Sequence, residues 1–225
     1  MSGLPAPIVV LISGRGSNLQ AILDEARAGR LPVEIRTVIS NNPEAHGLEV
    51  ARAAGIPTEV IDHRAFRERA QFDAALMQAI DRHQPKLVVL AGFMRILGTE
   101  FIRHYAGRLL NIHPSLLPAF KGLDTHARAL AAGVREHGAS VHFVTNDLDG
   151  GPVIVQAAVP VRPDDSADTL AARVLVEEHR IYPLAIRWAV EGRLSICNGQ
   201  VLLDGARRPE QRFAPVAAPA RDAQS

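Results

Sequence analysis

Short apolar runs alternate with segments of helical periodicity along the first half of the chain. The runs PIVVLIS, VEIRTVIS, TEVI and KLVVLAG have the length of buried strands. After each run, apolar residues recur at helical spacing, which predicts helices over residues 17–29, 47–55, 66–83 and, for a short stretch, within 97–107. Strands that alternate with helices form parallel sheets covered on both faces, so we expect an α/β fold.

The second half of the chain predicts a change of strand direction. After the run RLLNIH, the loop PSLLPAFKGLDTH precedes a helix from about Ala127 to Ala132. The runs ASVHFV and PVIVQAAVPV flank TNDLDGG, whose Asp-Gly pair is typical of a tight antiparallel turn. A helix from about Ser166 to Val190 and a small hairpin, LSICNGQVLL, follow. We therefore expect a single domain with a mostly parallel, mixed sheet and helices on both faces.

The composition is that of a globular domain with a small-molecule partner. A chain of 225 residues, 47% of them hydrophobic, can bury one sizeable core. The formal net charge is +1 and the arginines are scattered, which argues against a nucleic-acid partner. The first residues contain no charged leader, and their apolar run is too short for a signal peptide or a membrane span, so we expect a cytoplasmic protein. The single cysteine, Cys197, excludes an intrachain disulfide and a cysteine-based zinc cage.

Two polar side chains interrupt the apolar run LLNIHPSLLP. Asn111 and His113 alternate with Leu110 and Ile112, so on a strand they share one face and lie roughly 7 Å apart. Pro114 stops the strand, which places His113 at its carboxyl end, where open α/β sheets bind their ligands. An amide and an imidazole at this position indicate a functional site.

The segment SGRGSNLQ joins the first strand to the first helix and has two interpretations. In the first, Ser17 caps the helix, Gln20 completes a capping box and the glycines only turn the chain. In the second, the glycine-rich turn presents free backbone N–H groups and the positive end of the helix dipole to a phosphate. Leu19 replaces the third glycine of a dinucleotide fingerprint, and no P-loop lysine follows, so a phosphomonoester is the better ligand.

The remaining candidate groups are histidines and one acidic turn residue. The nine histidines lack the spacing of an HExxH motif or a zinc finger, so no metal site is expected. Asp149 in DLDGG could be only the first residue of its Asp-Gly turn. It could also present a carboxylate to His113, which would raise the pKa of the imidazole and suit a group that donates a proton near neutral pH.

Four separated motifs together resemble one family. VVLISGRGSNLQAI, VVLAGFMRIL, GRLLNIHPSLLP and SVHFVTNDLDGGPVI, in this order and spacing, resemble the folate-dependent phosphoribosylglycinamide formyltransferases, the glycinamide ribonucleotide transformylases of purine synthesis. The resemblance runs from about Ile8 to Asp204 and implies a Rossmann-like formyltransferase domain over residues 1–204. We expect residues 205–225, which end in the aperiodic APVAAPARDAQS, to form a disordered tail.

The resemblance implies a role for residues in each motif. The catalytic trio of the family corresponds to Asn111, His113 and Asp149. Contacts to the ribonucleotide are implied for the phosphate loop and for an acidic residue of the last long helix, namely Gly16, Ser17, Asn18 and Glu178. The folate side is implied for one arginine and two segments, namely Arg69, then Met94, Arg95, Ile96 and Leu97, and then Thr145, Asn146, Asp147 and Leu148. The sequence departs from the pattern of several relatives at Asp124 and Leu175.

The implied reaction transfers the formyl group of 10-formyltetrahydrofolate, used as a cosubstrate without a metal, to the amine of 5-phosphoribosylglycinamide. The amine attacks directly, through a tetrahedral intermediate with a developing oxyanion. Asn111 and His113 would stabilise the oxyanion, and Asp149 would raise the pKa of His113. The implied partners are these two small molecules, with neither nucleic acid nor a membrane, and the protein would be a monomer or a homodimer.

Two other functions fit part of the sequence. A formyltetrahydrofolate deformylase uses water in place of the amine and resembles this chain around the Asn-x-His and Asp motifs, but such enzymes usually carry an extra N-terminal regulatory domain. A non-catalytic phosphate-binding module would need only the first loop and would leave Asn111 and His113 unexplained. Formyl transfer is therefore the preferred interpretation.

Overall fold

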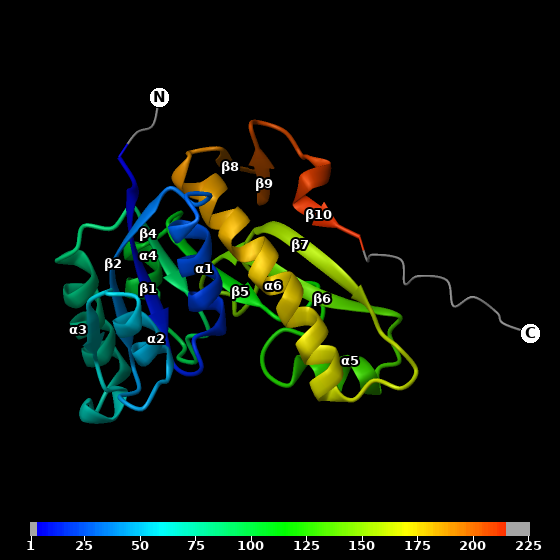
Figure 1. Cartoon of the computed structure of the whole chain (residues 1–225), viewed down its shortest axis with the longest axis horizontal. Helices are drawn as coiled ribbons and strands as arrows, with labels where there is room; N and C mark the ends of the chain where they lie inside the picture. The colour runs from blue at the N-terminus through cyan, green and yellow to red at the C-terminus, as the bar shows by residue number, and fades with distance from the viewer. Residues whose placement is uncertain (1–3, 215–225) are drawn as a thin grey trace, which may run out of the picture.

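The computed structural model describes residues 4–214 and contains one large sheet with helices on both faces (Figure 1). The strands of this sheet run in the order β10-β7-β6-β5-β4-β1-β2-β3. Their bounds are β1 Ala6–Ile12, β2 Val33–Ser40, β3 Thr58–Val60, β4 Leu87–Leu90, β5 Leu109–His113, β6 Glu136–Phe143, β7 Val153–Pro160 and β10 Arg212–Phe213. A separate hairpin pairs β8 Leu194–Cys197 with β9 Gln200–Leu203.

The helices divide between the two faces of the sheet because alternate residues of each strand point to opposite sides. Ile8, Val10 and Ile12 of β1 pack into a core that includes α1, α2 and α6, whereas Val9 and Leu11 pack with α3 and α4. In Figure 1, α1 and α6 lie in front of the sheet. The helix bounds are α1 Ser17–Arg27, α2 Gly47–Ala53, α3 Arg69–Asp81, α4 Thr99–His104, α5 Thr125–Ala131 and α6 Ala167–Val190, with two short 3₁₀ turns, η1 His63–Ala65 and η2 Pro209–Gln211.

Strand directions follow the prediction from the sequence. β1 to β5 are parallel, and β6 then runs antiparallel to both β5 and β7, which confirms the mixed α/β sheet. The carboxyl ends of β1, β4 and β5 therefore meet at one edge of the sheet, and the loops that follow them lie side by side. The order of the strands makes this edge the expected location of a ligand site.

The connection between β6 and β7 is longer than the tight Asp-Gly turn that was predicted. The strands end and begin at Phe143 and Val153, and the Phe143 N–H donates to the carbonyl of Pro152 over 3.0 Å. Gly151 is required here, because a Cβ at this residue would lie 1.8 Å from the carbonyl oxygen of Phe143. The result is a loop that carries Asp149 back over the sheet edge instead of a two-residue hairpin.

The chain past residue 204 differs from the predicted disordered tail as far as the structure describes it. Arg212 and Phe213 pair in parallel with Gln156 and Ala157 of β7, and the buried Gln211 bonds to the backbone of two strands. Residues 215–225 lie outside the described residues. Within 4–214, none of the helices is long and apolar enough to cross a bilayer.

Candidate active site

The glycine-rich loop after β1 leads into α1 without a side-chain cap. The predicted capping box of Ser17 and Gln20 is wrong: the N-cap residue is Gly16, with φ +83°, no side chain accepts from the first turn, and the Gln20 amide instead bonds to Asp24. The first N–H groups of a helix have no partner inside the helix. The loop over residues 14–18 therefore retains the free donors and the dipole that an anion needs.

Only glycine fits at position 16, because the start of α2 lies close to its Cα and because its own φ is positive. A Cβ on Gly16 would lie 2.6 Å from the Cα of Gly47, and the Gly47 N–H donates to the carbonyl of Gly14 over 2.9 Å. Gly47 thus fixes the back of the loop. Its role was missed because nothing in the local sequence around residue 47 shows that α2 starts against the loop.

Asn18 and Glu178 come together from α1 and α6. The Asn18 amide donates to Oε2 of Glu178 over 2.7 Å, and both residues are buried. Burial raises the pKa of Glu178, although the hydrogen bond from Asn18 opposes this shift. Oδ1 of Asn18 is buried without a partner in the described chain, which leaves an acceptor available to a ligand N–H or hydroxyl. The predicted ribonucleotide residues therefore form one connected cluster.

His113 lies between two acceptors. Its Nε2 lies 3.0 Å from the carbonyl oxygen of Phe120, and its Nδ1 lies 3.5 Å from Oδ2 of Asp149. A carbonyl and a carboxylate oxygen can only accept, so both ring nitrogens of His113 face acceptors. Asp149 is held in place because its Oδ2 also accepts the N–H of Gly122 over 2.9 Å. The meeting of His113 and Asp149, which the sequence only suggested, occurs in the structure.

Asn111 is oriented by His142, a residue that sequence reasoning set aside. The two residues face each other across β5 and β6, and Nδ2 of Asn111 lies 3.2 Å from Nε2 of His142. Burial lowers the pKa of His142, and its Nδ1 lies 2.9 Å from the Phe143 carbonyl, which assigns the single proton to Nδ1. Nε2 then accepts one N–H of Asn111 and leaves the second for a ligand. Only the pairing of β5 with β6 could have identified His142.

The segment after β4 is tied to the glycine-rich loop through Ser13. The Met94 N–H donates to the Ser13 hydroxyl over 2.7 Å, and that hydroxyl donates to Asn41. Met94 and Ile96 expose large apolar side chains, while the Leu97 side chain is buried in the core and can meet a ligand only through its backbone. The two predicted binding regions, for phosphate and for folate, therefore share a hydrogen-bonded boundary.

Arg69 and Arg95 both lie near a buried carboxylate. Burial raises the pKa of Asp73, whereas the Gly98 N–H at 2.8 Å and the charges of the two arginines lower it. Asp73 thereby fixes the start of α4 through the hydrogen bond from Gly98, and its charge attracts Arg69 and Arg95. Both arginines are exposed.

Two loops cover the site from the side of β6. Lys121 pairs with Asp147 at 2.9 Å, which joins the loop after β5 to the loop that carries residues 145–148. Leu148 is exposed, and Thr145 bonds only within its own loop. Within the described chain, no hydrogen bond joins residues 94–97 to residues 145–148.

The two departures from the family pattern lie beside these elements. Asp124 is the N-cap residue of α5, has φ +55° and makes no side-chain cap. Leu175 is half-buried on α6, three residues before Glu178. Within the described chain, neither side chain forms a hydrogen bond with the site residues above. Among residues 4–214, no group of three or more His, Cys, Asp or Glu side chains is arranged to hold a metal ion.

A half-buried amide, a buried imidazole and a carboxylate lie at the carboxyl edge of a mixed α/β sheet, next to an uncapped glycine-rich loop. These are features of an enzyme with small-molecule substrates. Residues 6–186 match the formyl transferase family, so the chain belongs to this family. The predicted enzyme class, a transferase of a one-carbon formyl group, is confirmed.

Individual relatives give a narrower comparison. The phosphoribosylglycinamide formyltransferase of Escherichia coli (strain K12) is 56% identical over 92% of this chain and 98% of its own. The structure of the phosphoribosylglycinamide formyltransferase of Coxiella burnetii in complex with CHES has a TM-score of 0.88 and 53% identity, covering 94% of this chain and 100% of that one. A formyltetrahydrofolate deformylase from Pseudomonas syringae pv. tomato has a TM-score of 0.84 at 28% identity, covering 90% of this chain and 67% of its own. The resemblance to phosphoribosylglycinamide formyltransferases is therefore confirmed.

Proposed function

We propose that this chain transfers the formyl group of 10-formyltetrahydrofolate to the primary amine of 5-phosphoribosylglycinamide, a step of purine synthesis. One observation carries the proposal: the His113–Asp149 pair, which is suited to proton transfer, lies at the same edge of the sheet as the glycine-rich loop, which is suited to binding a phosphate. The names of the relatives at 56% and 53% identity support the choice of substrates. The two small molecules are the proposed partners, and the cytoplasm is the proposed compartment.

Asn111 and His113 are the proposed donors to the developing oxyanion. The second N–H of Asn111 is free once His142 has accepted the first. The N–H on Nε2 of His113 contacts Phe120 in this structure and has to leave that carbonyl before it can reach a substrate oxygen. One preorganised donor of this kind contributes about 3 kcal/mol to lowering a barrier. The substrate amine is the nucleophile, so no covalent bond to the enzyme is needed.

Asp149 is proposed to keep His113 oriented and charged. A carboxylate 3.5 Å from the imidazole favours the protonated ring. During the reaction the amine nitrogen loses a proton and the departing folate nitrogen gains one. His113 with Asp149 is the titratable pair proposed to pass this proton, directly or through water.

The ribonucleotide is proposed to bind between α1 and α6. Its phosphate would accept hydrogen bonds from the backbone N–H groups of Gly16, Ser17 and Asn18 at the start of α1, where the helix dipole favours negative charge. Glu178, with its other contact made to Asn18, would accept from the hydroxyl or amide groups of the same substrate. This arrangement would place the amine of the substrate toward His113.

The folate is proposed to lie along the exposed segment after β4. The backbone of Met94, Arg95, Ile96 and Leu97 would line one side, and the loop of Thr145, Asn146, Asp147 and Leu148 would close over the pterin. Arg69 would face the anionic end of the folate together with Arg95. Exposed apolar side chains in both segments support this assignment, because a flat aromatic ligand would cover them.

The proposal is tested by mixing the protein with 10-formyltetrahydrofolate and following the release of tetrahydrofolate with and without 5-phosphoribosylglycinamide. Release that depends on the ribonucleotide is the expected result. Equal release without it would identify a deformylase, which the 28% identity to the solved deformylase makes the second candidate. Binding of both compounds with no release would identify a phosphate-binding module. Chelation of metal ions should leave the transfer unchanged, since every proposed donor is a protein group.

A further inference from the structure

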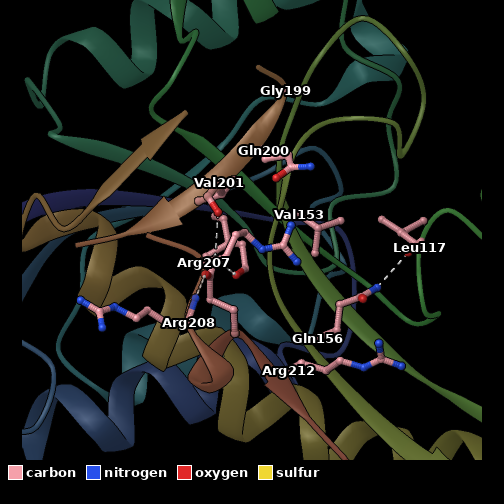
Figure 2. Close-up of a pocket in the computed structure, with 11 residues that line it drawn as sticks. Leu117, Val153, Gln156, Gly199, Gln200, Val201, Arg207, Arg208 and Arg212 are labelled. Carbon is pink, nitrogen blue, oxygen red and sulfur yellow. Dashed lines mark hydrogen bonds between the residues drawn. The ribbon is translucent and has the colours of Figure 1, made fainter. Parts of the chain in front are cut away.

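A cavity that none of the candidate active-site residues lines has several arginines in its walls. It has a volume of about 210 Å³ and lies between β7, the β8–β9 hairpin and the segment 207–212 (Figure 2). Among the described residues that line it are Arg207, Arg208 and Arg212, together with the side chains of Gln156 and Gln200, and none of the lining residues is acidic. This cavity has no part in the proposed formyl transfer.

The positive charge of the cavity is not neutralised within the described chain. Arg207 extends toward Val153 in the middle of the cavity and Arg212 runs below Gln156, whereas the Arg208 side chain points away (Figure 2). Neither Arg207 nor Arg212 forms an ion pair with a described carboxylate, in contrast to nearby Arg193, which pairs with Asp204 at 2.7 Å. Both arginines are exposed and line the same cavity, so two guanidinium groups without a described carboxylate partner are available to an anion there.

The walls that present these arginines are fixed by buried hydrogen bonds. The Gln211 amide donates to the carbonyls of Ile154 and Val201 over 3.0 and 3.2 Å, and its Oε1 accepts the Arg208 N–H over 2.9 Å. Gln211 is buried, so the segment between Arg207 and Arg212 is attached to two strands at once. Guanidinium groups on a fixed backbone lose less freedom when they bind than groups on a free tail.

The Gln156 amide group completes the cavity and is also fixed. Its Nε2 donates to the carbonyl of Leu117 over 2.9 Å and lies 2.8 Å from the Ser140 hydroxyl. Leu117 belongs to the loop whose Phe120 carbonyl contacts His113. A ligand that contacts Gln156 in the cavity would therefore change the surroundings of Leu117, which lies on the loop that leads to the active site.

We propose that this cavity is a second anion-binding site, which takes a phosphate or diphosphate group through Arg207 and Arg212. Guanidinium groups match the oxygens of phosphate with two parallel N–H bonds and keep their charge at all physiological pH values. A volume of about 210 Å³ is below that of pockets for drug-sized ligands and holds the anionic group alone. In a nucleotide, the nucleoside would remain outside the cavity.

The test is a site-resolved titration of the full, ¹⁵N-labelled chain with inorganic diphosphate, followed by NMR. The amides of Gly199, Val201 and Leu117 and the Gln156 side chain report on the cavity, and the amides of Gly16 and Ser17 report separately on the proposed substrate loop. We expect saturable shifts at the cavity with a dissociation constant below about 1 mM. The double variant Arg207→Gln/Arg212→Gln should lose these shifts and keep those of the loop.

The matched control is Arg27→Gln/Arg135→Gln, which removes the same charge from exposed positions elsewhere and should bind as the wild type does. Retention of the cavity shifts in Arg207→Gln/Arg212→Gln, or their absence in the wild type, would overturn the site. Equal affinity for citrate would overturn its preference for phosphate. Equal affinity for diphosphate and ADP would show that the group alone is recognised, whereas tighter binding of ADP would identify a nucleotide as the source of the group.

Discussion

Asp149 combines an uncommon backbone angle with a nearly buried carboxylate. Its φ is +47°, and its side chain is only 9% exposed beside His113. Asn adopts positive φ about as readily as Asp does, and an amide oxygen can still accept the Gly122 N–H that Asp149 accepts now. The exchange of Asp149 for Asn therefore removes the charge at this position and little else.

Asp149→Asn should lower turnover on the order of 100-fold and leave folate binding largely intact. It should also move the basic limb of the pH–rate profile toward lower pH, because loss of the neighbouring negative charge makes the protonated imidazole easier to deprotonate. His113→Ala and Asn111→Ala should each reduce turnover by a similar amount, and the losses should not add because the residues act as a unit. Steady-state kinetics over a range of pH measure all of these quantities.

The control for the charge change is Asp164→Asn at an exposed position outside the site, which should keep the wild-type profile. A basic limb that stays in place in a folded Asp149→Asn protein would show that Asp149 acts only as a turn residue, the first interpretation of its Asp-Gly context.

At the scale of elements, the site depends on close contact between the glycine-rich loop and α2. The Cα atoms of Gly16 and Gly47 approach so closely that neither position has room for a side chain: a Cβ on Gly47 would lie 3.1 Å from the Gly16 Cα and 3.3 Å from the Gly14 carbonyl oxygen. The third neighbour, Cδ1 of Ile12 at 2.7 Å, is the end of a flexible side chain and can move. The loop backbone would therefore have to shift by a few tenths of an ångström.

Gly47→Ala should weaken ribonucleotide binding while the protein stays folded. A displaced loop no longer points its N–H groups at the phosphate, so the KM for 5-phosphoribosylglycinamide should rise on the order of tenfold, with little change in the KM for the folate. Glu49→Ala, an exposed change on the same helix, should leave both values unchanged. An equal rise in both KM values would mean that the loop does not hold the phosphate.

For the whole molecule, hydrophobic periodicity was sufficient to predict the alternating strands and helices, the mixed sheet and the position of His113 at a strand end. Periodicity is a local signal, and it failed where long-range contacts decide the outcome. The uncapped start of α1 at Gly16 depends on its contact with Gly47. The role of His142 depends on the pairing of β5 with β6. The ordered structure of residues 205–214 depends on the hydrogen bonds from Gln211 to β7 and β9. Those contacts join positions that are distant in the sequence.

Four buried or half-buried histidines link the stability of the whole molecule to pH. Burial lowers the pKa of His137 to about 4 and also lowers the pKa values of His126, His142 and His179. Below the unfolded value of about 6.5, the unfolded chain binds protons that the folded chain does not. The free energy of unfolding should therefore fall as the pH decreases from about 6.5 toward 4, by on the order of 2 kcal/mol at pH 5 from His137 alone. Glu178, with its raised pKa, acts in the opposite direction.

Urea unfolding at pH 7 and pH 5 measures this fall, and His137→Phe should reduce it because the ring remains but no longer titrates. His46→Phe, at an exposed position, should keep the full difference. An unchanged difference in His137→Phe would assign the pH dependence to the other histidines.

The short strand β10 has a consequence for solubility. β7 would be the last strand of the sheet on its side if β10 did not pair with Gln156 and Ala157. An uncovered strand edge is a template for strands of other molecules, and chains that expose one tend to aggregate. A chain that ends at residue 204 should therefore self-associate in light scattering, whereas one that ends at residue 214 should behave as the full chain does. Identical scattering from the two chains would mean that an uncovered β7 edge does not cause self-association. Stronger scattering from the chain that ends at residue 204 would mean that residues 205–214 prevent strands of other molecules from adding to the sheet.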